Sequence, residues 1–167
     1  MKAARLLAFL LAFATLGAVL PALQAQSPPQ PVSWSVALEP RGSSSVAAGG
    51  TITVAVTAKI NEGWHVYGTE ELKDGPRPLA IALADGQPFK AAGKLQAPEA
   101  DRDFDESFNQ VTTFYGKTTT FRLPVAVSSG APRGPAAVDI EIGFQACDGR
   151  ICLPGRTVKL SAPLEIR

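Results

Sequence analysis

Trp34-Ser-Val-Ala-Leu38 and Ile52-Thr-Val-Ala-Val56 are the stretches that decide the fold, because in both of them apolar side chains alternate with small or polar ones. A period of two is that of a β-strand with one buried face, whereas a surface helix would repeat every 3.6 residues. Both stretches are therefore predicted to be half-buried strands.

Six more strands are predicted between turn-rich stretches. They are Trp64–Tyr67, Leu79–Leu83, Phe89–Leu95, Thr118–Val127, Val138–Ala146 and Thr157–Ile166. No segment has a sustained helical stripe, and 14 prolines and 15 glycines would interrupt one. Eight short strands with frequent turns favour an all-β, immunoglobulin-like β-sandwich. A closed barrel stays open as an alternative, because periodicity does not show whether the sheet edges meet.

The first 25 residues have the layout of a signal peptide. Lys2 and Arg5 precede an uncharged apolar run, Leu6 to Leu20, and small residues follow to Ala25. A membrane span is the competing interpretation, but Pro21 ends the run at about 15 residues, short of the roughly 20 that a spanning helix needs. We therefore expect cleavage and export.

Residues 26–31 are predicted to be a Pro-rich tether, and residues 32–167 to form one domain. About 142 residues after cleavage are enough to bury a core without disulfide or metal staples. They carry 14 basic and 15 acidic side chains, a formal charge of −1. We expect no nucleic-acid partner, and no membrane span after signal cleavage.

The stretch Glu99 to Glu106 contains five acidic residues in eight and is predicted to be a loop. It is either a solvated surface loop or a mobile flap beside a site.

Cys147-Asp-Gly-Arg-Ile-Cys152 lies between two predicted strands, and its Asp-Gly step is a strong hairpin signal. The two cysteines would then face each other at the hairpin base, with a Cα separation near 5.5 Å that suits a disulfide. Closing so short a ring stabilises a fold by about 2 kcal/mol, against about 4 kcal/mol for a loop of some sixty residues. The spacing alone leaves both an inert staple and a redox centre open.

Metal binding is a weaker alternative, because two thiolates and the lone His65 fall short of four zinc ligands. A Cys–His hydrolase is also disfavoured, since exported cysteines at pairing distance are normally oxidised. Arg150 would favour a thiolate and Asp148 would oppose it, so charge assigns no nucleophile. We expect no metal and no cofactor.

The segment Phe144-Gln-Ala-Cys-Asp-Gly-Arg-Ile-Cys-Leu-Pro154 resembles the redox hairpin of the amino-terminal domain of the thiol:disulfide interchange protein DsbD. Gly63-Trp-His-Val-Tyr67 and Phe114-Tyr-Gly-Lys117 resemble two more motifs of that family, in the same order along the chain. The resemblance extends over roughly Val32 to Ile166. It implies an immunoglobulin-like fold, a periplasmic location and a cysteine pair that passes electrons by thiol–disulfide exchange.

The resemblance also implies the site residues. Cys147 and Cys152 would be the redox pair, with Cys152 forming the mixed disulfides. Phe114 and Tyr115 would belong to a cap loop that shields the pair, and Tyr67 and His65 would line the pocket. The alternative is that Phe114 and Tyr67 are ordinary core aromatics and that His65 is an exposed strand residue.

The sequence departs from the family at two of these places. Thr112 and Thr113 precede Phe114 where the family's cap loop has acidic residues, which puts a carboxylate role in proton transfer in doubt. His65 stands where the pocket has an aromatic hydroxyl.

We expect a stand-alone domain of the protein-disulfide reductase type, because this chain has neither a transmembrane electron conduit nor a thioredoxin-like domain. Its partners would be a thioredoxin-like electron donor and oxidised periplasmic thiol–disulfide proteins. The rival interpretation is a non-enzymatic immunoglobulin-like binding module with a structural hairpin disulfide.

Overall fold

The computed structural model describes residues 30–167, and within them the chain is all-β, with no helix. The predicted signal peptide (1–25) and most of the tether (26–31) lie outside these residues. The strands are β1 (Val32–Glu39), β2 (Ser45–Val46), β3 (Thr51–Ile60), β4 (His65–Tyr67), β5 (Ala80–Leu83), β6 (Phe89–Ala91), β7 (Asp101–Asp105), β8 (Gln110–Tyr115), β9 (Thr118–Val127), β10 (Gly134–Phe144), β11 (Ala146–Cys147) and β12 (Arg156–Ile166).

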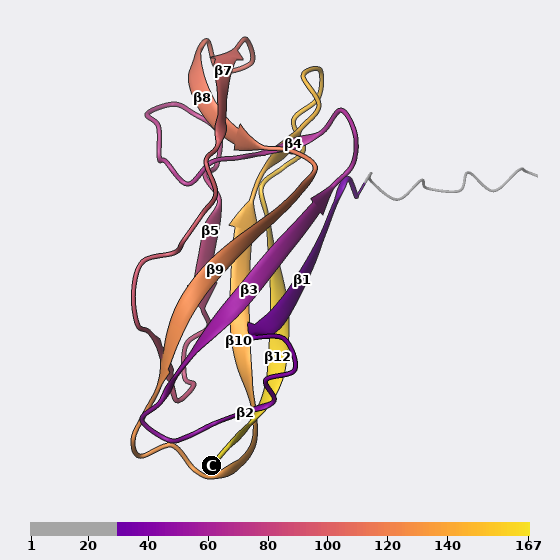
Figure 1. Ribbon diagram of the computed structural model, residues 1–167. Coiled ribbons are helices and arrows are strands. Elements are labelled where there is room, and N and C mark those ends of the chain that lie inside the picture. The colour runs from indigo at the N-terminus through magenta and orange to yellow at the C-terminus, as the bar shows by residue number, and fades with distance from the viewer. Residues whose placement is uncertain (1–29) are drawn as a thin grey trace, which may run out of the picture.

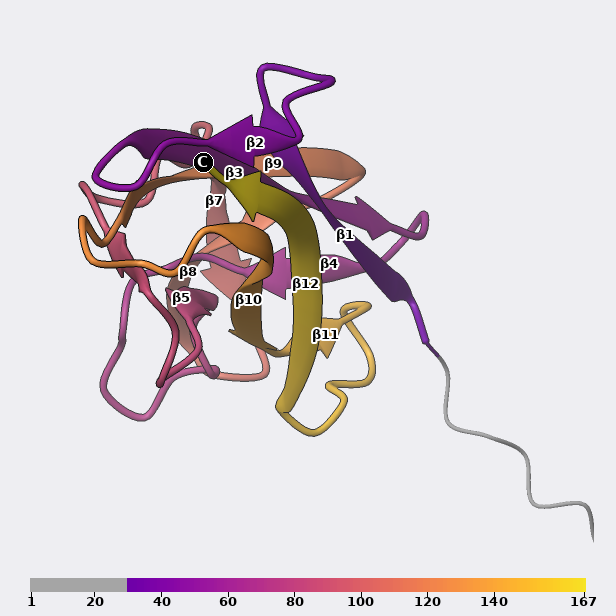
Figure 2. The same ribbon diagram turned by 90° about the horizontal axis from the view of Figure 1, so that it is seen from below.

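Two four-stranded sheets make an immunoglobulin-like sandwich, as predicted. One has the order β1-β3-β9-β6 and the other β2-β12-β10-β5. Figure 2 looks at the molecule from below, and β10 and β12 lie across the interior from β3 and β9. Every pairing is antiparallel except the short parallel contact between β12 and β2. Each sheet ends in its own edge strands, so the sandwich is open and the barrel alternative is excluded.

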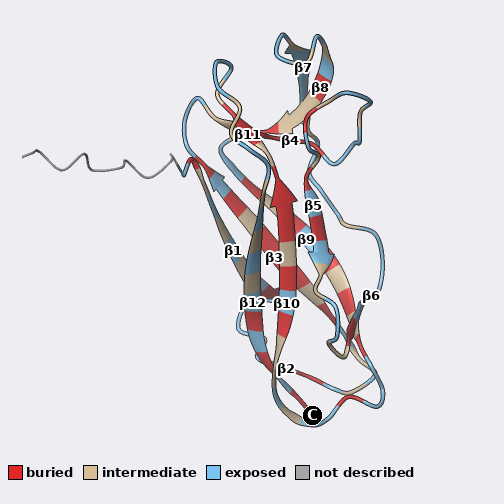
Figure 3. Cartoon of the chain, turned by 180° about the vertical axis from the view of Figure 1, so that it is seen from behind, coloured by how far each residue is buried: buried red, intermediate tan, exposed pale blue. Residues whose placement is uncertain are grey.

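The core lies between the two sheets and follows from the period-two pattern. On the first sheet, Val54 lies opposite Leu123 and Val56 opposite Phe121, with all four side chains buried. The facing strand β10 contributes residues at alternate positions, among them Ile140, which is fully buried. Figure 3 shows the buried residues along the inner strands β3, β9 and β10. Burial of alternate side chains on two facing sheets is the main source of stability in such a fold.

A third, smaller sheet with the order β11-β4-β8-β7 lies at one end of the sandwich. Figure 1 shows it at the top of the molecule, with the β7–β8 hairpin beside the loop that follows β11. This sheet carries the residues that the sequence predicts for the site.

The structure corrects two local predictions. The acidic stretch is not a loop, because Asp101–Asp105 forms β7 and pairs along its whole length with β8. Phe114 lies on β8, so the segment predicted as a cap loop is one strand of a hairpin. The sequence does carry a signal for β7, since Asp101, Asp103 and Asp105 recur at every second residue.

None of the residues from 30 to 167 belongs to a helix long and apolar enough to cross a membrane.

Candidate functional site

The cysteine hairpin forms as predicted, and Cys147 is bonded to Cys152. The flanking backbone bonds run from Leu153 N to Ala146 O (2.9 Å) and from Asp148 N to Ile151 O (3.2 Å). The two cysteines between them are therefore a non-hydrogen-bonded cross-strand pair, the closer of the two kinds. This explains a Cα separation of 4.2 Å where about 5.5 Å was expected.

Asp148 holds the tip of the cysteine loop. Its Oδ1 accepts hydrogen bonds from the backbone N–H groups of Ile151 (2.8 Å) and Arg150 (2.9 Å). These bonds stabilise the carboxylate and lower the pKa of Asp148. Gly149 has a φ of +82°, a left-handed conformation that a glycine adopts without strain. The Asp-Gly step thus makes the turn that sets the cysteines opposite each other.

The two sulfur-bearing residues differ in exposure. Cys147 is only 1% exposed, whereas Cys152 is half-buried. A thiolate from another molecule must reach a sulfur atom before it can exchange with the bond. Cys152 is therefore the more accessible of the two sulfur-bearing residues.

Tyr67 is buried against the disulfide from β4. Its hydroxyl oxygen lies 3.1 Å from Cys147 Sγ and 3.8 Å from Cys152 Sγ. The hydroxyl also donates a hydrogen bond to Asp105 Oδ2 at 2.7 Å. Burial, followed by the bond and the charge of Asp105, raises the pKa of Tyr67, so the phenol keeps its proton.

The β7–β8 hairpin covers this tyrosine. Asp105 is fixed at both carboxylate oxygens, since Oδ1 accepts from the N–H of Ser107 at 2.8 Å. The ring of Phe108, in the turn between the strands, packs edge-on against Tyr67 with centroids 5.7 Å apart. Phe114 on β8 lies opposite Tyr67 in the strand register and is half-buried. The hairpin thus contributes a carboxylate and two aromatic rings to the disulfide's surroundings.

His65 lies between these groups. It is the cross-strand neighbour of Cys147, and its ring is 5.1 Å from the rings of both Tyr67 and Phe114. Burial lowers the pKa of His65, and attraction to Asp105 and Asp148 partly opposes the effect. The neutral imidazole is therefore favoured in the folded protein.

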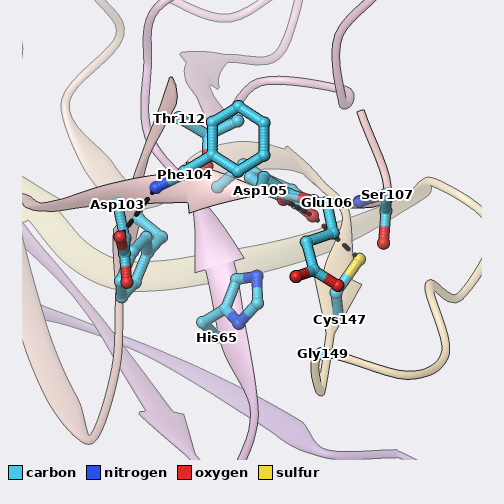
Figure 4. Close-up of a pocket in the computed structure, with 11 residues that line it drawn as sticks. His65, Asp103, Phe104, Asp105, Glu106, Ser107, Thr112, Cys147 and Gly149 are labelled. Carbon is cyan, nitrogen blue, oxygen red and sulfur yellow. Dashed lines mark hydrogen bonds between the residues drawn. The ribbon is translucent and has the colours of Figure 1, made fainter. Parts of the chain in front are cut away.

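A cavity of about 270 Å³ lies among these elements, and Figure 4 shows the side chains around it. Residues of β4, the hairpin and the cysteine loop line it, including His65, Tyr67, Asp103, Asp105, Phe114 and Cys147. Four of its lining residues carry ionisable carboxyl or imidazole groups, and these share the surface beside Cys147 with aromatic rings. Within residues 30–167, no three His, Cys, Asp or Glu side chains are grouped as a metal site requires.

The structure brings together five of the six residues predicted for the site and leaves Tyr115 outside it. Tyr115 is buried, packs edge-on against Phe121 at 4.9 Å, and donates to the carbonyl of Pro98 at 3.4 Å. Its side chain points into the sandwich because neighbours on a strand face opposite sides. Sequence reasoning gave no site role to Asp105 or Phe108. Asp105 belongs to the acidic stretch for which a flap beside a site was one alternative, and Phe108 follows that stretch.

The domain is an immunoglobulin-like sandwich with a hairpin disulfide, one half-buried cysteine and a tyrosine hydroxyl against the sulfur of the other. The family model described as "Thiol:disulfide interchange protein DsbD, N-terminal" matches residues 36–163, which is 128 of the 167 residues. The chain belongs to this family.

Among solved structures, the chain is similar to the N-terminal periplasmic domain of ScsB from Proteus mirabilis, with a TM-score of 0.53 and 12% identity. The match covers 85% of this chain and 49% of that one, so this chain spans about half of its length. At that identity the likeness supports the fold alone. The major pilin GBS80 of Streptococcus agalactiae matches with a TM-score of 0.44 and 9% identity, over 82% of this chain and 56% of that one. No curated protein matches the chain by sequence.

Proposed function

We propose that this protein is a periplasmic thiol:disulfide interchange domain that relays electrons through Cys147 and Cys152 to oxidised partner proteins. Membership of the DsbD amino-terminal family supports the reaction class. The observation that carries the proposal is the asymmetry of the pair, with Cys152 half-buried and Cys147 buried beneath a tyrosine hydroxyl. One sulfur can be attacked while the other is held in place as the leaving group.

The exchange would proceed in two steps. A thiolate of a thioredoxin-like donor attacks Cys152 Sγ, a mixed disulfide forms, and the bond to Cys147 breaks with its electron pair on Cys147 Sγ. The donor's second thiol then attacks the mixed disulfide and leaves both cysteines of this protein reduced. In the second half of the cycle, the Cys152 thiolate attacks the disulfide of an oxidised acceptor in the same way.

The hairpin would act as a cover in this cycle. Phe114, Phe108 and Asp105 pack around His65 and Tyr67 on the Cys147 side of the disulfide, so a partner that docks over that side would displace them. A cover of this kind suppresses exchange with stray thiols and permits it on docking. Export would follow from the signal peptide at residues 1–25, with residues 26–31 tethering the domain from residue 32 onward.

The reduction potential tests the proposal. The oxidised protein is equilibrated with glutathione or dithiothreitol buffers, and a thiol label counts the reduced sulfurs. We expect a value near or above about −230 mV, in the range of exchangeable couples. A value below about −300 mV would identify a structural bond. The protein would then be a binding module, and electron transfer would be abandoned.

A further inference from the structure

The Tyr67 hydroxyl lies between two groups that compete for its single hydrogen. Its oxygen is 2.7 Å from Asp105 Oδ2 and 3.1 Å from Cys147 Sγ. A hydroxyl has one hydrogen to donate, and a carboxylate is a much stronger acceptor than a disulfide sulfur. While the hairpin covers the disulfide, the hydrogen is therefore directed to Asp105 and not to the sulfur.

Attack on the disulfide reverses this preference. When a donor thiolate bonds to Cys152 Sγ, the Sγ–Sγ bond breaks and its electron pair becomes a thiolate on Cys147. Cys147 is 1% exposed, so water solvates that charge poorly. In the described part of the chain, the Tyr67 hydroxyl is the hydrogen-bond donor that lies against Cys147 Sγ. It can stabilise the leaving thiolate only if Asp105 no longer takes its hydrogen.

We propose that Asp105 holds the Tyr67 hydrogen away from Cys147 while the hairpin is closed, and that displacement of the hairpin by a docking partner turns this hydrogen toward the Cys147 leaving thiolate. Tyr67 is then a catalytic residue, and Asp105 is a positioning residue that couples docking to reactivity. The inference rests on the proposed function, since it concerns the same disulfide. No proton leaves Tyr67 in this step, and the donor's thiolate supplies the electrons.

The arrangement of the strands supports the coupling. Asp105 is at the end of β7, whereas Tyr67 and Cys147 are on β4 and β11, so movement of the hairpin separates the carboxylate from the other two groups. The raised pKa of Tyr67 keeps the phenol protonated and therefore a donor. Asp103 lines the same cavity but forms no hydrogen bond to Tyr67; its Oδ1 accepts from the N–H of Phe104 at 2.8 Å. Asp103 therefore offers a matched control for the loss of charge.

The experiment compares Asp105→Ala with Tyr67→Phe in the full mature domain. Both variants lose the hydrogen bond from Tyr67 to Asp105. If the loss of this bond loosens the hairpin, it does so in both variants. The rate of disulfide reduction by dithiothreitol at pH 7 is followed by quenching with iodoacetamide and mass spectrometry. Asp103→Ala measures the effect of one fewer negative charge near the attacking thiolate, and circular dichroism verifies that each variant is folded.

We expect Asp105→Ala to be reduced about tenfold faster than Tyr67→Phe, the rate equivalent of one hydrogen bond to a charged group. Asp105→Ala should also be reduced faster than Asp103→Ala. The double variant, Tyr67→Phe with Asp105→Ala, should be reduced as slowly as Tyr67→Phe alone. Asp105→Asn keeps the size of the side chain and leaves a weaker hydrogen-bond acceptor. Its rate of reduction should lie between those of wild type and Asp105→Ala. It serves in place of Asp105→Ala if the alanine variant does not fold.

Equal rates for the two single variants would overturn the inference, because they would mean that Asp105 acts only as a latch. A double variant as fast as Asp105→Ala would overturn it in the same way. Failure of dithiothreitol to reduce the bond in wild type and in all variants, while it reduces the denatured chain, would instead overturn the proposed function and this inference with it.

Discussion

His65 on β4 lies directly opposite Cys147 on β11, with its ring held 5.1 Å from the rings of Tyr67 and Phe114. The residue is therefore packed beside the cysteine pair and is not a freely exposed strand residue. Burial lowers the pKa of His65, and this effect is larger than the opposing attraction to the carboxylates of Asp105 and Asp148.

This burial predicts a loss of stability in mild acid. Because the pKa of His65 is lower in the folded than in the unfolded state, the unfolded chain binds the extra proton first as pH falls. Stability should decrease as the pH drops through about 6.5, the ordinary value for histidine, and level off below the folded-state pKa. Thermal melts of wild type and His65→Gln between pH 7.5 and 5 test this. An identical pH dependence in the two proteins would contradict it.

The single-cysteine variants should differ in reactivity. Cys147→Ser leaves the half-buried Cys152, whereas Cys152→Ser leaves the buried Cys147. We expect Cys152 to react with an aromatic disulfide reagent about tenfold faster or more, because exchange requires access to the sulfur. The release of the coloured thiol measures both rates, and the two variants unfolded in urea provide the reference. Faster reaction of Cys147 would reverse the assignment of the attacked sulfur.

Removal of the Phe114 ring should uncover the pair. Phe114→Ala deletes a half-buried ring from β8, which should destabilise the fold by about 1–2 kcal/mol and raise the rate of reduction by dithiothreitol. Phe104→Ala is the matched control, because Phe104 lies on the same hairpin and is 53% exposed. Urea unfolding and quenched alkylation measure the two effects. Equal reduction rates in Phe114→Ala and wild type would count against a shielding role.

Gly68 permits the close approach of β8 to β4. A Cβ atom at this position would clash with Thr113 Oγ1 and lie 3.2 Å from the Thr113 carbonyl oxygen. Gly68 N also donates to that carbonyl at 2.6 Å, so the strands cannot separate without losing this bond.

Gly68→Ala should therefore displace the hairpin and speed both hydrogen exchange of β8 amides and reduction of the disulfide. Gly116→Ala is the control, because a Cβ there meets nothing within 4 Å. Amide exchange followed by mass spectrometry compares the two variants. Unchanged protection of β8 in Gly68→Ala would show that the hairpin adapts without moving.

Much of the fold could be predicted from local patterns, because each main strand buries every second side chain. The alternation in Trp34 to Leu38 and Ile52 to Val56 corresponds to β1 and β3, which pair with each other. A strand without an alternating apolar face is harder to predict from the sequence. β7 carries charged side chains and an exposed Phe104, so it has no apolar face. The alternation of its aspartates is its only local signal, and its pairing with β8 is what identifies it as a strand.

The site was predictable only in part, for a related reason. The turn chemistry of Asp148-Gly149 is local, and it places Cys147 opposite Cys152 whatever surrounds the hairpin. The contact between Tyr67 and Asp105 joins residues 38 positions apart through the register of β4, β8 and β7, and no short motif encodes it. A carboxylate from another strand, that of Asp105, thus lies beside Tyr67 although Thr112 and Thr113 precede Phe114.

The sequence by itself determined the main strands and the six-residue cysteine hairpin, because strand alternation and tight turns depend on neighbours along the chain. Only the tertiary structure decided which sulfur is buried, which hydroxyl contacts it and which carboxylate holds that hydroxyl. Those properties depend on how the third sheet places β4, β8 and β11 side by side at one end of the sandwich. The exposure of each sulfur and the hydrogen bonds of Tyr67 arise from that packing, which joins residues far apart in the sequence.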